Sequence, residues 1–423
     1  MKRRALLLVA IAILAILPGR AAQAPAPIVI LVSIDGWRWD YIDKTNAPNI
    51  KALAARGVRS QGLIPSFPSV TFPNHYTLVT GLVPDHHGII ANAMVDRSIG
   101  TEKFTMSSDT AKNPAWWGGE PIWQTVIRNG GKSAAMFWPG SEAIKPTYWR
   151  AFDDDVPNMD RVAQVLEWLR LPEADRPSFS TLYFSEIDHV GHDFGPDAPE
   201  LLTAAEHVDA AIGQLVWGIE DLGLAERTSI VLVSDHGMAA TSSDRVIYLD
   251  DYLQNDEIEV VDWSPNIEIN PATTSSADAI YQKLANKHPA LAVYRRADLP
   301  KWLNYGTNKR IPAVIGIAEL GWTITTHAAA KARLESGRSF TGGGHGYDPR
   351  YRELHGLFIA AGPGLRRGVI VPEFRNVHVY NVLCKLLGLA PAPNDGDLSE
   401  VASLWGRTPF PQVFNRWGTG LTR

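Results

Sequence analysis

Cysteine is almost absent from this sequence. Cys384 is the only one among 423 residues, so no disulfide can form within the chain. It lies in a helix-like segment, residues 377–387, on the same face as Val377, Tyr380 and Leu387. That spacing indicates a core position for Cys384 and not a reactive thiol.

Long apolar runs are also scarce. The one candidate, residues 5–17, follows the basic residues 2–4 and precedes a small-x-small site at 22–24. This order predicts a secretory signal peptide over residues 1–24, with an uncleaved anchor as the alternative. The run is too short for a comfortable membrane span. We therefore expect a periplasmic or secreted protein with no stable membrane span after cleavage, and the lack of disulfides favours the periplasm.

The chain has no excess of basic charge, repeats or low-complexity linkers. Its net charge is −5 and 20% of its residues are charged, which gives no indication of a nucleic-acid polymer as a partner. A hydrophobic content of 45% is ordinary for a globular protein. Because 423 residues is long for one core, we expect a single catalytic domain over residues 25–423 that carries an insertion.

Apolar runs and helical patterns alternate along most of the chain. Residues 27–34 and 229–234 are continuous apolar runs, which predict central parallel strands buried on both faces. The alternation predicts an α/β fold, a doubly wound sheet with helices on both faces. The rhythm is lost over about 245–340, where we expect a small α+β insertion. Its predicted elements are a strand at 266–270, a helix at 276–288, a strand at 291–295 and a hairpin within 313–326.

Polar side chains follow the predicted strands at the point where each strand ends. Such strand exits meet at one edge of an open sheet. Asp188 and His192 are four residues apart, so one helical turn would present both on one side. Three carboxylates and three imidazoles are enough for two metal ions, and mixed oxygen and nitrogen ligands suit zinc. The residues are Asp35, Asp188, His192, Asp235, His236 and His345.

Thr71 is the candidate nucleophile. It precedes a predicted helix start, where Thr is a favoured N-cap and Pro73 suits the first turn. A hydroxyl there lies in positive potential beside free N–H groups, which suits an alkoxide and a phosphate. Thr71 alone would pass as a capping residue, and the Asp and His cluster favours the catalytic role. Asn92 could donate an amide hydrogen bond to a bound oxyanion, whereas His75, His86 and His87 are expected to be structural.

Five motifs together resemble the nucleotide pyrophosphatase/phosphodiesterase family of the alkaline phosphatase superfamily. The resemblance runs from about residue 28 to about residue 387 and implies an alkaline-phosphatase-like fold. The motifs are Ser33-Ile34-Asp35-Gly36, the Pro-x-x-Pro-x-x-Thr-Phe-Pro-Asn-His segment ending at His75, Asp188-x-x-x-His192, Asp235-His236-Gly237-Met238 and His345-Gly346-Tyr347-Asp348.

The resemblance implies a zinc-dependent phosphodiesterase. It would hydrolyse nucleotide phosphodiester or pyrophosphate bonds to nucleoside 5′-monophosphates through a covalent phospho-Thr71. A match to Asn92 helps to bind the phosphoryl oxygens in that family. One zinc ion is held there by residues matching Asp35, Thr71, Asp235 and His236, and the other by residues matching Asp188, His192 and His345.

Some positions depart from the family pattern or compete with it. Pro349 and Leu354 stand where the family often has Asn and Met. His355 could be mistaken for the ligand, but we prefer His345 because a Gly-rich loop allows close backbone approach.

Rival functions lack their own signatures. A sulfatase would need a modifiable Cys or Ser in a Cys/Ser-x-Pro-x-Arg setting, and residues 66–70 have Val70 where the Arg would stand. A phosphomonoesterase would need an Arg beside Thr71, and none is found there. Cofactor-independent phosphoglycerate mutase is cytosolic, whereas this chain carries an export signal. A non-catalytic zinc-dependent binding protein stays open.

Aromatic residues predict the substrate pocket. Phe72 directly follows Thr71, and residues 146–152 resemble the family segment whose last aromatic faces that ring. Phe72 and Phe152 would form the walls of a slot for a nucleotide base, with Trp138 and Tyr183 on the ribose side or rim. The same rings could instead enclose a quaternary ammonium, so a choline-phosphodiester or lysophospholipid phosphodiesterase is the alternative.

Overall fold

The fold is built on β1 (Ile28–Ile34), a fully buried strand at the centre of an eight-stranded sheet. The computed structural model describes residues 25–263 and 265–406. β1 pairs in parallel with β9 and β8, as its continuous apolar sequence predicts. The order is β19 (Val369–Val371), β2 (Val58–Ser60), β18 (Phe358–Ala361), β9 (Thr228–Val233), β1, β8 (Phe179–Phe184), β6 (Ser133–Met136) and β7 (Tyr148–Trp149). Only β18, within this sheet, runs antiparallel to its neighbours β9 and β2.

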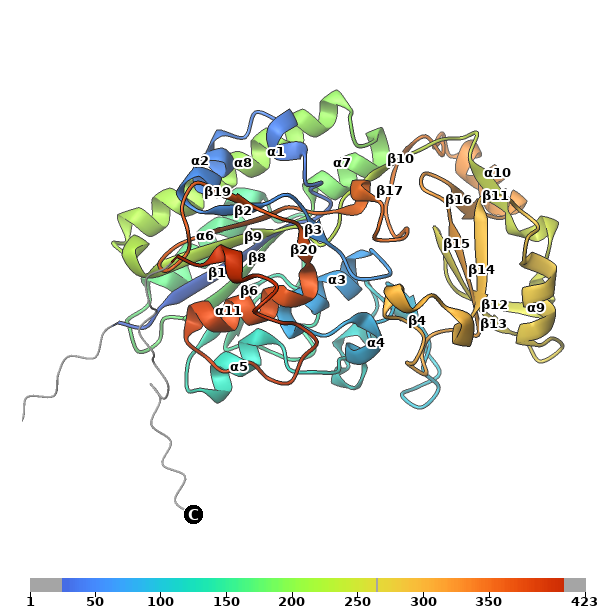
Figure 1. The fold of residues 1–423 in the computed structure, drawn as a ribbon, viewed down its shortest axis with the longest axis horizontal. Coiled ribbons are helices and arrows are strands. Elements are labelled where there is room, and N and C mark those ends of the chain that lie inside the picture. Colours follow the sequence, from blue (N-terminus) through green and yellow to red (C-terminus); the bar gives the residue numbers. More distant parts are fainter. Residues whose placement is uncertain (1–24, 264, 407–423) are drawn as a thin grey trace, which may run out of the picture.

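Helices cover both faces of this sheet (Figure 1). Alternate residues of β1 enter two separate cores: Ile28, Ile30 and Val32 enter one, Val29 and Leu31 the other. One face carries α2 (Pro48–Arg56), α6 (Asn158–Arg170) and α8 (Pro199–Asp221). The other carries α3 (Thr71–Thr80), α5 (Ile122–Arg128) and α11 (Val379–Leu387). The predicted doubly wound α/β fold is confirmed, and Cys384 is a core residue of α11 with 1% exposure.

A second, four-stranded antiparallel sheet lies to one side of the main sheet, drawn in yellow to orange in Figure 1. Its order is β12 (Ile258–Asp262), β13 (Asn266–Pro271), β15 (Val314–Ala318) and β14 (Leu291–Arg295), with α9 (Ala277–Leu284) packed on it. The predicted strand, helix and strand over 266–295 are confirmed. They build a hydrophobic core that includes Ile267, Ile280 and Leu291.

The hairpin predicted within 313–326 is wrong. β15 is flanked on both edges by β13 and β14, so it has no free edge for the next strand. The chain turns at Gly321, whose φ is +80°, and β16 (Thr323–Thr325) then pairs in parallel with β11 (Val246–Tyr248). Turn residues correctly predict the reversal but not the partner.

Short elements complete the described chain. β10 (Ala239–Thr241) pairs antiparallel with β17 (Gly342–Gly344) and returns the chain to the main sheet. The others are α1 (Tyr41–Lys44), α4 (Pro84–His87), α7 (Glu186–Phe194), α10 (His327–Glu335), β3 (Leu63–Ile64) with β20 (Phe374–Arg375), and β4 (Ala93–Met94) with β5 (Phe104–Thr105).

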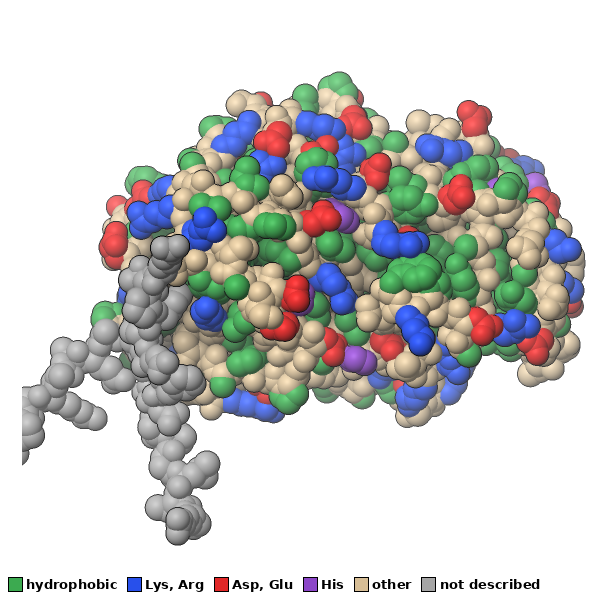
Figure 2. All heavy atoms as spheres, in the orientation of Figure 1, with side chains coloured by type: hydrophobic (Ala, Val, Ile, Leu, Met, Phe, Trp, Pro, Cys, Tyr) green, Lys and Arg blue, Asp and Glu red, His purple; other side chains and the backbone are tan. Residues whose placement is uncertain are grey.

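The described surface and helices bear on two further expectations. On the face drawn in Figure 2, Lys and Arg are interspersed with Asp and Glu, without a continuous basic patch. Among residues 25–263 and 265–406, no helix has the length and apolar character to cross a membrane. The predicted signal peptide, residues 1–24, lies outside the described residues.

Candidate active site

Three neighbouring strands of the main sheet place polar residues at one edge. Asp35 directly follows β1, and Asp235 and His236 come after β9. α7 begins two residues after β8 and carries Asp188 and His192. The ends of β1 and β9 are tied together, because the Gly36 N–H donates to Asp235 Oδ1 at 3.3 Å. The structure therefore brings the predicted strand-exit residues to a single place.

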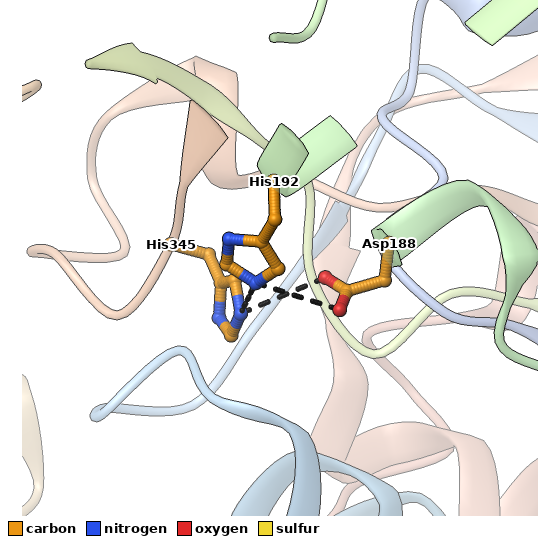
Figure 3. Close-up of side chains that lie close together, drawn as sticks. All are labelled: Asp188, His192 and His345. Atoms are coloured by element: carbon orange, nitrogen blue, oxygen red, sulfur yellow. Dashed lines mark hydrogen bonds and ion pairs between the residues drawn. The ribbon is translucent and has the colours of Figure 1, made fainter. Parts of the chain in front are cut away.

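Asp188, His192 and His345 form one candidate metal-binding group (Figure 3). His345 Nε2 lies 3.0 Å from His192 Nε2 and 3.6 Å from Asp188 Oδ1. His192 Nε2 lies 3.5 Å from Asp188 Oδ2. β17 delivers His345 by running against α7, where a Cβ added to Gly343 would lie 2.3 Å from a backbone oxygen. Glycine there allows the close approach that we expected of this loop.

The three histidines share one hydrogen-bonding arrangement. Nδ1 of His192, His345 and His236 each lies 3.0 Å from a backbone carbonyl oxygen. A carbonyl only accepts, so Nδ1 donates and Nε2 of the neutral ring keeps a lone pair. Metal-binding histidines are oriented in this way. The carbonyls belong, in the same order, to Gly343, Ser69 and Gly237.

A second group surrounds His236. Its Nε2 lies 3.0 Å from Asp235 Oδ2, 3.4 Å from Asp35 Oδ1 and 3.5 Å from Thr71 Oγ1. Asp35 Oδ1, Asp188 Oδ1 and Asp235 Oδ2 are buried without a hydrogen-bond partner in the described chain. No described Lys or Arg forms an ion pair with these carboxylates. This gathering of buried carboxylate oxygens and imidazole nitrogens fits divalent metal ions.

Burial and mutual charge shift the pKa values of several side chains in this cluster. Burial, together with the Asp235 and Asp188 carboxylates, raises the pKa of Asp35 well above its usual value. Burial would likewise raise the pKa of Asp235, but His236 and His75 hold it well below the usual range. Burial, His236 and His192 lower the pKa of His345, so this ring is neutral near pH 7. A neutral imidazole is the form that binds a metal ion.

Thr71 is the first residue of α3 and not its N-cap. Val70 occupies the cap position with extended backbone, and no side chain caps the helix. The predicted N-cap position of Thr71 is therefore wrong, and its hydroxyl makes no hydrogen bond to its own helix. It is half-buried and points toward His236. The predicted end of the helix is confirmed, since Gly81 is left-handed with φ +69°.

His75 lies beside the site in the structural role that we expected of it. It lies close to Asp35 and Asp235, yet both ring nitrogens are engaged. Nδ1 donates to Thr71 O at 2.9 Å, and Nε2 accepts from Ser33 Oγ at 2.8 Å. Trp138 in turn donates through Nε1 to His75 O and is 4% exposed. Trp138 thus has little surface for a substrate and does not lie on the predicted rim.

The other predicted pocket residues differ in exposure, and Tyr183 is buried. Tyr183 donates to Asp35 Oδ2 at 2.7 Å. Phe152 is 53% exposed, and its ring centroid lies 6.1 Å from that of Tyr183. Phe72 is half-buried. The Phe72 N–H donates to Asn92 Oδ1 at 2.9 Å, which leaves Asn92 Nδ2 as the end that can donate to a ligand.

The remaining histidines stay outside the metal-binding groups. His355 is 4% exposed; its Nε2 donates to Pro349 O, and its Nδ1 faces Glu373. His86 pairs with Asp395, and burial lowers the pKa of His87 to about 3. The geometry agrees with the preference for His345 over His355.

The comparisons with known proteins point in one direction. The profile of the type I phosphodiesterase / nucleotide pyrophosphatase family matches residues 29–348. A venom phosphodiesterase of Crotalus durissus collilineatus is 37% identical over 92% of this chain and 48% of its own length. Ectonucleotide pyrophosphatase/phosphodiesterase family member 3 of Mus musculus is 38% identical over 91% of this chain and 44% of its own length. The chain therefore spans about half the length of the curated relatives it matches.

A solved structure agrees over nearly the whole described fold. Murine ectonucleotide pyrophosphatase/phosphodiesterase 5, an inactive variant in complex with AMP, superimposes with a TM-score of 0.84 and 33% identity. The match covers 90% of this chain and 100% of that chain. On the family profile, the relatives and the fold, this chain belongs to the type I phosphodiesterase / nucleotide pyrophosphatase family.

Proposed function

We propose that this protein is a zinc-dependent phosphodiesterase that releases nucleoside 5′-monophosphates from nucleotide phosphodiester or pyrophosphate bonds. The observation that carries the proposal is the Thr71 hydroxyl, free of its helix and 3.5 Å from His236 Nε2. Three buried carboxylates and three oriented imidazoles surround it. The murine neighbour in complex with AMP supports a nucleotide as the ligand class.

Two zinc ions would be held by this donor set. Asp35, Asp235, His236 and Thr71 would bind one. Asp188, His192 and His345 would bind the other, and the closeness of these three side chains supports that assignment. When bound, zinc supplies positive charge that lowers the pKa of a hydroxyl and polarises a phosphoryl oxygen.

The chain's own residues divide the reaction into two displacements. The Thr71 oxygen forms a bond to phosphorus while the bond to the leaving alcohol or pyrophosphate breaks. The hydroxyl proton is lost in this step, and the leaving oxygen takes up a proton. Water then cleaves the Thr71–phosphorus bond and regenerates the hydroxyl. Asn92 Nδ2 donates to a phosphoryl oxygen throughout, because the Phe72 N–H fixes its amide.

Substrate selection would lie in the aromatic rings. Phe72 and Phe152 would hold the base, and stacking of this kind tolerates every base. Turnover should be compared for a nitrophenyl nucleoside monophosphate, nitrophenyl phosphate and nitrophenylphosphocholine. Preference for the nucleoside ester supports the proposal. Preference for the choline ester would instead make this a choline-phosphodiester or lysophospholipid phosphodiesterase, and the absence of turnover would favour a zinc-dependent binding protein.

A further inference from the structure

One segment next to the four-stranded sheet packs against the part of the chain that carries the main sheet. We name this segment, residues 304–311, the arm; it precedes β15. Its first anchor is Asp85 in α4, a carboxylate that is 6% exposed. Asp85 accepts the backbone N–H groups of Gly306, Thr307 and Asn308 at 2.8–3.2 Å. Three backbone donors on one buried carboxylate fix the path of the arm.

The second anchor is Arg310. Its Nη1 donates to Gly88 O at 2.7 Å and to Trp116 O at 2.6 Å, and its Nη2 donates to Ala115 O at 3.1 Å. Its Nε donates to Asp96 Oδ2 at 3.0 Å, and the two side chains are 11% and 6% exposed. The planar guanidinium therefore bridges two loops that are separate in sequence, a geometry that lysine cannot reproduce.

The fit around this guanidinium is close. Gly88 has φ +81°, and a Cβ added there would lie 2.7 Å from Arg310 Nη1. The guanidinium also lies over the Trp116 ring, 5.1 Å from its centroid. A third contact of the arm, Tyr305, packs edge-on against Phe67 at 5.2 Å.

Both bridged loops lead directly to the proposed nucleotide side of the site. Gly88 stands four residues before Asn92, which accepts the Phe72 N–H. Trp116 is followed by Trp117, whose ring lies 5.9 Å from Phe72. Arg310 therefore holds the loop that carries Asn92, which fixes the backbone of Phe72. It also holds the segment that carries Trp117, whose ring packs against the Phe72 side chain.

We infer that Arg310 is a positioning residue for nucleotide binding and that the arm gives the insertion this role. The inference rests on the proposed function. Among the described residues, Arg310 contacts neither Thr71 nor any candidate metal-binding residue. Its effect on nucleotide binding therefore passes through Trp117 and Phe72. Loss of the bridge should loosen the wall of the base slot while the metal-binding groups stay intact.

The test compares two esters that share a leaving group: a nitrophenyl nucleoside monophosphate and methyl nitrophenyl phosphate. Arg310→Ala should raise the KM for the nucleoside ester about fivefold or more and change kcat/KM for the methyl ester less than about twofold. Arg310→Lys keeps the charge beside Asp96 and should give an intermediate KM. Arg227→Ala is the control, since Arg227 pairs with Glu173 away from the site.

Folded variants are compared at equal zinc content. Equal losses on both esters, or an unchanged KM for the nucleoside ester, would overturn the inference. If Arg310→Ala fails to fold, the same criteria apply to Arg310→Lys. A wild-type enzyme that turns over neither ester would overturn the proposed function, and this inference with it. If the wild type prefers the nucleoside ester and Arg310→Ala has the same KM as the wild type, the inference about Arg310 is wrong and the proposed function still stands.

Discussion

His192 and His345 face each other through their Nε2 atoms. The two Nε2 atoms lie 3.0 Å apart, while each Nδ1 donates to a backbone carbonyl. When both rings are neutral, two lone pairs meet at this distance, and a cation between or beside them relieves their repulsion. The Asp188 carboxylate, within 3.6 Å of both rings, supplies the negative charge that such a cation needs.

Substitution of His345 should therefore cause the loss of one bound metal ion, whereas substitution of His355 should not. We expect His345→Ala to retain one zinc ion of two and to lose most of its activity. His355→Ala should keep both ions, because its Nε2 is committed to Pro349 O. Elemental analysis of the purified variants decides the point, and loss of zinc from His355→Ala would refute the choice of ligand.

Tyr183 should tune the site through Asp35. Its hydroxyl donates to Asp35 Oδ2 at 2.7 Å, so Tyr183→Phe removes one hydrogen bond and keeps the ring. Loss of such a ligand-orienting bond should weaken zinc affinity or activity by about 10- to 100-fold. Competition with a chelator measures the affinity. Tyr41→Phe is a matched control, since the Tyr41 hydroxyl is buried without a partner in the described chain, and an equal effect there would contradict the prediction.

Phe152 should affect nucleotides more than small diesters. Its ring is 53% exposed beside Tyr183, so its removal disturbs little packing. Because stacking on an aromatic contributes about 1–3 kcal/mol per base, Phe152→Ala should raise the KM of a nucleotide diester about 5- to 150-fold. Bis-nitrophenyl phosphate should be turned over nearly as before. The exposed Trp217 on α8 provides the control, Trp217→Ala, and similar losses on both diesters would mean that Phe152 only supports the scaffold.

Glu268 should make stability depend on pH. The Tyr305 hydroxyl lies 2.9 Å from Glu268 Oε1 and 3.1 Å from Ile90 O, yet it has one proton for two acceptors. A protonated Glu268 resolves the conflict by donating to Tyr305. Burial and the Asp262 carboxylate raise the pKa of Glu268 well above its usual value.

The sign of the dependence follows from that raised pKa. The stabilising contribution of the neutral carboxyl is complete below the unfolded pKa of about 4.3 and is lost as pH rises through the folded pKa. The Tm of Glu268→Gln relative to wild type should therefore increase steadily from about pH 5 upward. Thermal melts across this range test it, with the exposed Glu226→Gln as the control. A difference in Tm that is constant with pH would contradict the prediction.

Local chemistry made the main sheet and the strand-exit residues predictable. The apolar, β-branched runs that became β1 and β9 predict buried strands, and parallel strands bring their carboxyl ends to one edge. Asp35, Asp188 and Asp235 meet for that reason. Helix ends were predictable where glycine or proline determines the backbone, as at Gly81.

Long-range contacts were not predictable in the same way. The partner of β16 depends on which strand edges are already occupied. The roles of His75, Trp138 and Tyr183 depend on hydrogen bonds between residues distant in sequence, and no local pattern marks them. The bridge made by Arg310 joins loops 194 and 222 residues away from it, so it emerges only from the folded structure.

The most direct test of the central proposal is the turnover of Thr71→Ala. The variant should fold and bind two zinc ions through the six remaining Asp and His ligands. It should retain less than about one thousandth of the wild-type kcat on a nitrophenyl nucleoside monophosphate, because the nucleophile is absent. A rate above a small percentage of wild type, at full zinc content, would show that phosphorus is attacked by something other than Thr71 and would contradict the proposed mechanism.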